Sequence, residues 1–374
     1  MGLDSEFSDD SSRANSKRIL CYCSNMLGLK TISDELKDAL DEAGITADFV
    51  YFEYNEAYRA STPRFFSMRK LSENFDGISA SRYVLKNVDL NRYDIIFVVS
   101  HQIAVPLKDL PATKKLIVLF DSTPKMAHRS NRQYKRSFRS IAKAVLASLF
   151  DTYYFGPLFK RADYLLPMST AAKNSILHDY SLPNAIADVI YTPVDVCAPK
   201  TLSSGFPKLI FVGNNFQRKG GDFLLKLFND YLSVNFQLFI ISKDPTVLDI
   251  PDHPNLTIIP GIPREELLNL YREMDIFILP TLRDDGGSAV CEALGAGLPV
   301  VVRDAGAQGD WVKSNENGML MPYESTEKDW SNAINSLIKT PEQYASYSEN
   351  SILTAEKLLS KEIFIKKILK SLSI

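Results

Sequence analysis

The chain has 374 residues, which exceeds one ordinary hydrophobic core and suits two domains of typical size. With 45% hydrophobic residues, 24% charged residues and a formal net charge of −2, it has the composition of a globular protein and no overall attraction to nucleic acid. Four scattered cysteines exclude a disulfide framework and suggest no metal site, so we expect a cytoplasmic protein without a bound metal.

Residues 1–16 are polar and Ser-rich, and we expect a disordered leader there. Residues 17–200 alternate short apolar runs with segments of helical period, which is typical of stacked βα units and a parallel sheet. The expected strands are 18–23, 47–52, 95–100, 115–120, 164–167 and 188–191, and the first helix is expected at 31–43. No apolar stretch reaches the length of a membrane span.

The same pattern begins again after residues 198–207, a Ser-, Pro- and Gly-rich segment that we interpret as a linker. Residues 201–350 are expected to form a second domain with strands at 208–212, 236–241, 256–259, 276–279, 299–302 and 318–320 and helices at 222–231, 264–274 and 290–296. The sequence therefore predicts an α/β protein of two Rossmann-like domains with parallel sheets that face each other across a cleft. We expect the C-terminal segment, 351–374, to form a helix that returns to pack on the first domain.

The most informative stretch runs from Leu282 to Val300, where an expected strand end is followed by a glycine loop and a helix. Gly286 and Gly287 let the backbone approach a ligand, and the helix that follows presents free N–H groups, which favours a diphosphate. Asp284 and Glu292 are eight residues apart and can face one ligand, where carboxylates bind sugar hydroxyls well. The alternative is that the glycines only turn the chain and Glu292 is only solvated.

A second candidate for phosphate binding opens the second half of the chain. A β-run ends at Gly213, and Arg218 and Lys219 follow it directly before two glycines and a helix. Arg218 can form a forked pair with phosphate oxygens, and Lys219 adds a point charge. Adjacent surface cations are common, so the place of this pair after the first strand of the domain is what favours binding.

These motifs resemble glycosyltransferase family four. The resemblance rests on F-x-R-K-G-G-D-x-L-L, then G-x-x-x-E-E-L-x-x-L-Y-x-x-M-D-I-F-I-L-P, then a D-x7-E pattern that ends in E-A-L-G-A-G-L-P-V-V. It covers residues 209–311 well and the N-terminal half only loosely. The resemblance implies the GT-B architecture, retention of anomeric configuration, a nucleoside-diphosphate sugar donor of the UDP or GDP type, and no catalytic metal or other cofactor.

The resemblance also implies roles for single residues. Arg218 and Lys219 would hold the diphosphate, Glu292 the ribose, and Asp284 the transferred sugar. The remaining donor contacts that it implies are Gly213, Gly261, Ile262, Gly286, Gly287 and Ser288. The family usually has Glu at the position of Asp284 and often Arg at that of Asn214, so the diphosphate clamp would rest more heavily on Arg218.

In the first half, His101 follows the run 95–100 directly, where the family places a cleft histidine that contacts the transferred sugar. Gly28 stands where the family brings a glycine loop close to the phosphates. The alternatives are a histidine that satisfies loop backbone groups and a simple turn. Asp121, just after another expected strand, is a candidate for donor or acceptor contact, although an Asp before Ser-Thr-Pro is more often a turn residue.

Residues 125–155 combine a basic patch with an apolar helical stripe and an aromatic cluster, which makes them a candidate for peripheral contact with the inner face of an anionic membrane or for binding an acceptor phosphate. A solvated helix that packs on its own domain is the plainer interpretation. We expect a glycan or lipid-linked acceptor and no nucleic-acid partner, and the sequence does not define the oligomeric state. Three alternatives remain: a GT-B epimerase, a phosphorolytic enzyme, and a non-catalytic protein that binds nucleotide sugars.

Overall fold

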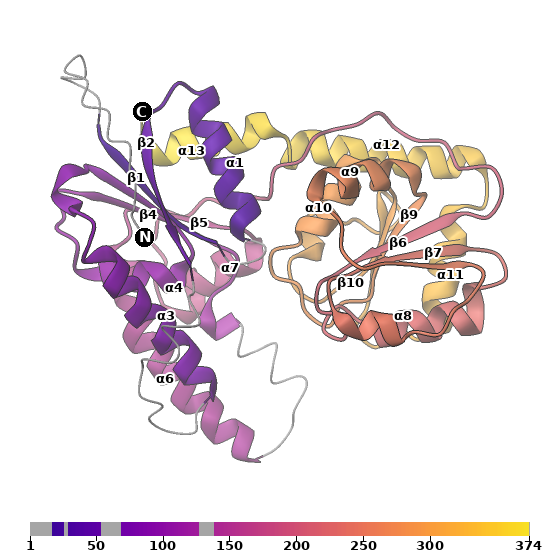
Figure 1. Ribbon diagram of the computed structural model, residues 1–374, viewed down its shortest axis with the longest axis horizontal. Coiled ribbons are helices and arrows are strands. Elements are labelled where there is room, and N and C mark those ends of the chain that lie inside the picture. The colour runs from indigo at the N-terminus through magenta and orange to yellow at the C-terminus, as the bar shows by residue number, and fades with distance from the viewer. Residues whose placement is uncertain (1–16, 26–28, 54–68, 127–137, 374) are drawn as a thin grey trace.

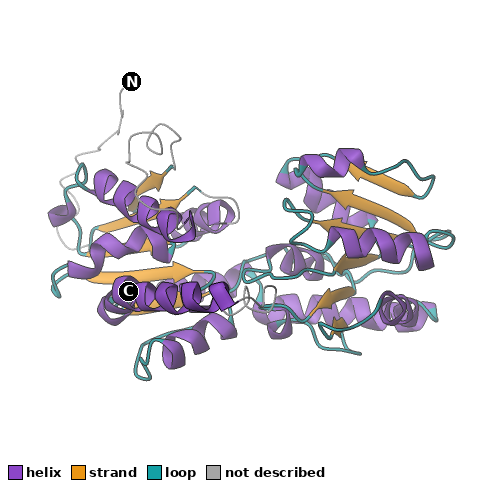
Figure 2. Ribbon diagram, turned by 90° about the horizontal axis from the view of Figure 1, so that it is seen from below, coloured by secondary structure: helices purple, strands orange, loops and turns teal. Residues whose placement is uncertain are grey.

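The computed structural model of the protein describes residues 17–25, 29–53, 69–126 and 138–373. Two parallel sheets lie in two separate lobes, each covered by helices (Figures 1 and 2). The first sheet has the order β2-β1-β3-β4-β5 and the second the order β11-β10-β9-β6-β7-β8. The expected fold class, two Rossmann-like α/β domains, is confirmed.

The strands form where β-branched and aromatic residues cluster in short runs. Those of the first sheet are β1 (Ile19–Ser24), β2 (Ala47–Phe52), β3 (Ile95–Val99), β4 (Lys115–Phe120) and β5 (Tyr164–Pro167). Those of the second sheet are β6 (Lys208–Val212), β7 (Gln237–Ile241), β8 (Leu256–Ile259), β9 (Ile276–Leu279), β10 (Val300–Arg303) and β11 (Gly318–Met321). Each lies within about one residue of the strand that the sequence predicts.

Helices cover both sheets. Those of the first domain are α1 (Leu29–Glu42), α3 (Arg69–Leu85), α4 (His101–Ala104), α6 (Phe138–Arg161) and α7 (Thr170–Asn174), which continues into a π-helical turn (Ser175–Asp179). Those that follow β6 are α8 (Gly221–Leu227) with its π-helical turn (Phe228–Leu232), α9 (Arg264–Glu273), α10 (Ser288–Gly295), α11 (Glu327–Leu337), α12 (Pro341–Leu358) and α13 (Lys361–Leu372). Short 3-10 turns complete the description at Leu90–Arg92, Val105–Asp109, Pro245–Asp249 and Gln308–Asp310.

Alternation along the central strand divides the core of the first domain into two faces. Leu20 and Tyr22 of β1 point to the face covered by α3, α4 and α6. Ile19 and Cys21 point to the opposite face, which α1 covers. Because the side-chain period of a strand is two, one apolar run supplies both cores.

The C-terminal segment forms two helices rather than the single helix expected from 351–374. α12 packs on the second domain, the chain breaks at Ser360, and α13 crosses to lie beside α1 (Figure 1). Phe364, Ile368 and Leu372 of α13 join the core of the first domain. The expected return of the C-terminal helix is therefore confirmed.

The predicted strand at 188–191 is wrong. Only Ala187 forms a bridge to β5, through Leu165. The Asp188 and Ile190 N–H groups donate to the carbonyls of Leu165 and Pro167. The hydrogen bond that would extend the ladder has to come from residue 167, and proline has no N–H to donate.

Two chain segments cross between the domains, and they lie side by side. Val194 N–H donates to the carbonyl oxygen of Leu359 over 2.9 Å, and Val194 forms an isolated bridge with Ser360. Lys361 and Asp195 form an exposed ion pair at the same place, with Nζ and Oδ1 2.8 Å apart. The two crossings therefore form one hinge.

Candidate active site

The expected donor loops lie at the topological switch point of the second sheet. β6 and β9 are neighbours, and their outgoing connections cover opposite faces of the sheet. In open parallel sheets the crevice at the carboxyl ends of two such strands is the usual ligand site. The loop after β6 carries Gly213, Arg218 and Lys219, and the loop after β9 carries Asp284 to Ser288.

The two loops are bound to each other. Leu282 N–H donates to the carbonyl oxygen of Arg218 over 2.9 Å, and Nη1 of Arg218 donates to the carbonyl oxygen of Arg283 over 2.7 Å. Gly220 has a φ of +83°, and a Cβ there would lie 2.0 Å from the carbonyl oxygen of Pro280. Only glycine permits this approach, which brings both loops to one side of the crevice.

Lys219 and Asp284 form an ion pair at the centre of these loops. Nζ and Oδ2 are 2.7 Å apart, and the side chains are only 12% and 10% exposed. A Cβ on Gly213 would come within 2.8 Å of the Lys219 side chain, so this glycine makes room for the lysine stem. Asp284 also accepts a 3.3 Å hydrogen bond from Gly287 N–H.

Helix α10 begins at this loop, two residues earlier than the sequence predicts. Gly287 precedes it in a left-handed conformation with a φ of +59°, and a Cβ there would lie 2.2 Å from the ring of Trp311. Gly286 and Ser288 are partly exposed beside it. The helix begins at the carboxyl end of the β9 connection, and the first N–H groups of such a helix suit an anion.

Glu292 lies on the second turn of α10 and is buried. Arg264 donates to Glu292 through Nε over 3.4 Å, and Tyr271 OH lies 3.5 Å from the other carboxylate oxygen. Burial raises the pKa of the Glu292 carboxyl, and the charge of Arg264 opposes that shift. Arg264 also donates through Nη1 to Glu35 of α1 over 2.9 Å, which connects the two domains at the site.

An acidic pair faces the crevice beside these loops. Asp285 is held by Arg283, whose Nε lies 2.6 Å from Oδ2, and burial raises the pKa of the Asp285 carboxyl. Asp121 of the first domain comes close, since a Cβ on Gly286 would lie 3.8 Å from its Cβ. Burial also raises the pKa of Asp121, against hydrogen bonds from Ser122. The first domain thus approaches the donor loops at Asp121.

His101 lies at the carboxyl end of β3, as expected, but its ring is buried. Phe155 and Phe159 of α6 lie against the imidazole at centroid distances of 5.4 and 6.5 Å, and Phe120 lies at 6.1 Å. Burial lowers the pKa of His101 to about 4, partly opposed by the charge of Asp151. Contact of His101 with a sugar stays a prediction, since it requires the aromatic side chains of α6 to shift.

The remaining expected contacts are spread more widely. Gly261 and Ile262 follow β8, the edge strand two places from β6. Gly261 has a φ of +76° and packs against the Lys243 side chain. Gly28 and most of the basic patch at 125–143 lie outside the described residues. Lys125 is described, and its Nζ donates to the carbonyl oxygen of Asp179 over 2.7 Å.

Three further residues at the site, Arg264, Glu35 and Trp311, were not expected from the sequence. Arg264 opens α9 after a proline, a position that gives no sign of a bridge to Glu35, 229 residues away in the chain. Trp311 gives no sign in the sequence that its ring lies against Gly287. These contacts depend on the tertiary fold.

Two observations bear on metal binding and membranes. Within the described ranges, no group of three or more His, Cys, Asp or Glu side chains is placed to hold a metal ion. The same ranges contain no helix that is both long enough and apolar enough to cross a membrane.

Two Rossmann-like domains, with a glycine-rich loop at the switch point of the second sheet, have the architecture called GT-B, which solved glycosyltransferase structures share. Residues 198–354 match the family model described as "Glycosyl transferases group 1". This match covers the second domain together with α11 and α12, which is less than half of the chain.

Known proteins agree with this placement. A D-inositol 3-phosphate glycosyltransferase of Mycobacteroides abscessus is 29% identical over 225 residues, which are 53% of this chain and 48% of that protein. The chain thus spans about half the length of this relative, and 23% of the corresponding Rhodococcus erythropolis protein. Among solved structures, sucrose-phosphate synthase of Thermosynechococcus elongatus has a TM-score of 0.71 at 15% identity, covering 95% of this chain and 98% of that one. Anabaena Alr3699/HepE, solved with UDP and glucose, has a TM-score of 0.62 at 15% identity, covering 96% and 100%.

Proposed function

We propose that this protein is a retaining glycosyltransferase that moves a sugar from a nucleoside-diphosphate sugar of the UDP or GDP type to a hydroxyl acceptor, without a catalytic metal. The observation that carries the proposal is the Lys219–Asp284 pair at the start of α10, with Arg218 on the same loop pair. It combines cations, free helix N–H groups and a carboxylate within one crevice. Those groups match a diphosphate joined to a sugar.

In this proposal the ion pair rearranges when the donor binds. The diphosphate competes with Asp284 for Lys219, and the released carboxylate accepts hydrogen bonds from the sugar. Arg218, whose side chain is exposed, adds a forked contact to the phosphate oxygens. Gly286, Gly287 and Ser288 supply backbone donors. Glu292 accepts the ribose hydroxyls once Arg264 moves aside.

The chemical step requires stabilisation of the leaving group. The bond from the anomeric carbon to the phosphate oxygen breaks, and the acceptor oxygen attacks the same face through an oxocarbenium-like transition state. The acceptor proton passes to the leaving phosphate. Arg218, Lys219 and the α10 N–H groups stabilise the charge that develops on the diphosphate, so the contribution of the protein is mainly electrostatic and orientational.

A nucleotide panel tests the proposal first. Thermal unfolding is measured with UDP, GDP, ADP and CMP and with their sugars, because a ligand at about 100 times its Kd adds about 2.7 kcal/mol to the unfolding free energy. We expect stabilisation by one nucleoside diphosphate, stronger with one attached sugar, and slow hydrolysis of that donor. Stabilisation without hydrolysis or transfer would favour a non-catalytic nucleotide-sugar-binding protein, and no shift at all would contradict the proposal.

Two substitutions test the site assignment. We expect Arg218→Ala and Glu292→Ala each to lower kcat/KM by the equivalent of about 2 to 4 kcal/mol, since each removes charged hydrogen bonds to the donor. Lys328→Ala removes an exposed cation of the same domain and serves as the control. Unchanged turnover in both site variants, with intact folding, would refute the assignment.

The acceptor and the location of the protein are the least defined parts of the proposal. Leu149 and Tyr153 of α6 are 63% and 69% exposed, next to the basic patch, which supports peripheral contact with an anionic membrane on the cytoplasmic side. Co-sedimentation with anionic vesicles, at low and at high salt, tests this contact. Binding that salt does not weaken, or no binding, would count against it.

A further inference from the structure

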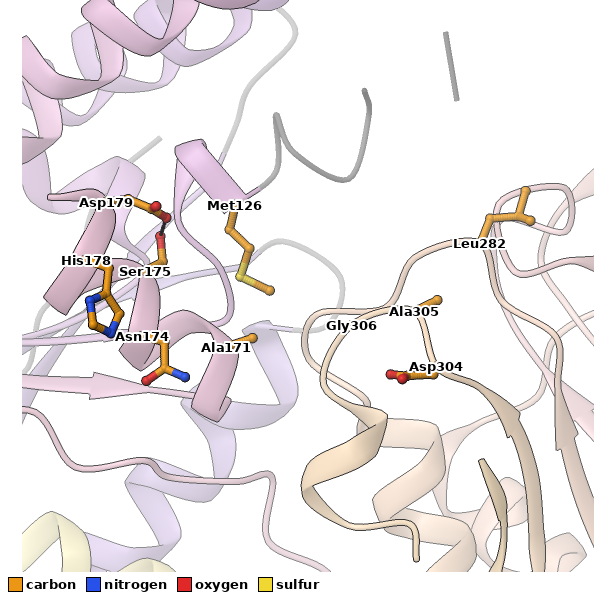
Figure 3. Close-up of a pocket in the computed structure, with 10 residues that line it drawn as sticks. All are labelled: Met126, Ala171, Asn174, Ser175, His178, Asp179, Leu282, Asp304, Ala305 and Gly306. Carbon is orange, nitrogen blue, oxygen red and sulfur yellow. Dashed lines mark hydrogen bonds between the residues drawn. The ribbon is translucent and has the colours of Figure 1, made fainter. Parts of the chain in front are cut away.

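A cavity of about 400 Å³ lies between the two domains, beside the donor loops (Figure 3). One wall comes from α7 and its π-helical turn, together with Met126 of the first domain. The opposite wall comes from Leu282 and from residues 304–306, which follow β10. The cavity is large enough for one or two sugar rings.

Three polar side chains line this cavity with unused hydrogen-bonding capacity. They are Asn174, His178 and Asp304, and Figure 3 shows them on facing walls. All three are exposed, and none hydrogen bonds through its side chain to another described residue. An amide, an imidazole and a carboxylate together offer the donors and acceptors that sugar hydroxyls need.

Beneath these groups the polar side chains are hydrogen bonded to one another. Ser175 Oγ lies 2.6 Å from Asp179 Oδ2 and 2.6 Å from Thr123 Oγ1, so the one hydroxyl of the π-helical turn is already engaged. Met126 and Leu282 add small apolar surfaces on the two walls. Apolar surface with a few convergent polar groups is what carbohydrate C–H faces and hydroxyls require together.

The cavity wall and Asp284 form one hydrogen-bonded unit. Asp284 N–H donates to the carbonyl oxygen of Ala305 over 2.9 Å, and the carbonyl oxygen of Asp284 accepts from Ala307 N–H over 3.0 Å. A Cβ on Gly306 would lie 2.1 Å from that same carbonyl oxygen. A molecule in the cavity therefore lies against the backbone that presents Asp284 to the donor sugar.

We infer that this cavity is the acceptor subsite and that it takes an uncharged polyhydroxylated compound, a sugar or a glycoside, in preference to a phosphorylated one. The inference rests on the proposed transferase function. Among the described residues that line the cavity, the acidic side chains are Asp179 and Asp304, and no Lys or Arg stands with them. Two carboxylates repel an acceptor phosphate and accept hydrogen bonds from hydroxyls.

The test separates acceptor binding from donor binding. Asn174→Ala and Asp304→Asn are compared with wild type and with Asp249→Asn, an exposed carboxylate of the same domain as Asp304 but away from the cavity. Saturation-transfer NMR in the presence of the stabilising nucleotide measures binding of methyl α-D-glucoside, methyl α-D-mannoside, myo-inositol, glucose 6-phosphate and inositol 3-phosphate. Transfer to the same compounds is measured alongside donor hydrolysis.

We expect at least one uncharged compound to bind and accept the sugar, and each cavity variant to raise its KM about tenfold, the loss of one or two hydrogen bonds. Nucleotide stabilisation and donor hydrolysis should stay within about twofold of wild type, since neither group contacts the donor. Asp304→Lys should improve use of the phosphorylated compounds.

Three results would overturn the inference: a wild-type preference for the phosphorylated compounds, no binding of any uncharged one, or unchanged acceptor KM in both cavity variants. Loss of hydrolysis together with transfer in Asp304→Asn would also do so, because it places the residue in the donor site. These results differ from those expected if the proposed transferase function is wrong. In that case no nucleotide would stabilise the wild-type protein.

Discussion

Lys219 and Asp284 form a nearly buried ion pair, and the proposed function also makes them donor ligands. Their charges are nearly buried, so in the ligand-free protein each charge is stabilised by the other. Removing one member of a buried pair leaves an unpaired charge, which costs more free energy than the pair contributes as a unit. Each of the two proposed donor ligands therefore stabilises the fold only while the other member of the pair is present.

This gives a prediction for unfolding. We expect Lys219→Met to lower the unfolding free energy by about 3 kcal/mol, and Asp284→Asn in the same chain to restore about 1 to 2 kcal/mol of it. Both tryptophans, Trp311 and Trp330, belong to the second domain, so their fluorescence in urea follows this domain. The exposed pair Lys226 and Asp230 is the control and should show no measurable coupling. Additive losses at 219 and 284 would contradict the pairing.

His101 predicts a dependence of stability on pH. Its pKa is lowered to about 4 in the folded protein against 6.5 as the ordinary value, so the unfolded chain binds the proton more tightly. Stability is therefore lost as the pH falls between these values, by about 3 kcal/mol in total. Urea unfolding of wild type and His101→Phe from neutral pH down to about 4 should give curves that diverge on the acid side. Parallel curves would show that the imidazole is not buried.

The sequence predicts which candidate site residues lie near each other best where they are close in the chain. Asp284 and Glu292 follow from one loop and helix, because eight residues fix their separation whatever the rest of the fold does. Arg264 and Glu35 could not be found in this way, since each belongs to an ordinary helix start or helix face. Their contact can be predicted only when the relative position of the two domains is known.

Elements were predicted well where a local pattern decides them. All the strands of both sheets were expected from apolar runs, and their parallel pairing from the helices between them. The strand expected at 188–191 does not form because β5, its partner, has Pro167 where an N–H donor is needed. Residues 188–191 themselves give no sign of this. The break between α12 and α13 was missed because helical periodicity continues through Ser360.

The start of α10 gives a prediction at this scale. We expect Gly287→Ala to lower the unfolding free energy by about 2 to 5 kcal/mol, from left-handed backbone strain and from overlap with Trp311. Gly205→Ala is the matched control, because its φ is +92° but no atom lies within 4 Å of the new Cβ. It should lose only about 1 to 2 kcal/mol. Equal losses measured by tryptophan fluorescence would show that the Trp311 contact is unimportant.

At the scale of the whole molecule, described residues of the two domains also contact each other outside the hinge. Thr170 N–H donates to Asp310 over 2.7 Å, and Arg264 connects Glu35 with Glu292. Because Glu292 is also the proposed ribose ligand, nucleotide binding and the contact between domains compete for the same carboxylate. Donor binding and domain position should therefore be coupled.

Glu35→Gln tests this coupling. We expect it to weaken the contact by about 1 kcal/mol and so to raise the open fraction about fivefold. Small-angle X-ray scattering of the ligand-free protein should give a larger radius of gyration than wild type at low salt and the same value at high salt. Asp41→Asn, an exposed carboxylate on the same helix, should match wild type throughout. No difference at low salt would remove Glu35 from the domain contact.

The path of α13 has a consequence for synthesis on the ribosome. The second domain uses a continuous stretch of chain, whereas the first takes Phe364, Ile368 and Leu372 from α13, which is translated after the whole second domain. One apolar face of the first sheet is therefore incompletely covered until about 160 further residues have been translated. The second domain can fold as it emerges, whereas the first is completed only after α13 has been translated. A stalled or prematurely terminated chain would thus present an exposed apolar sheet to the chaperones.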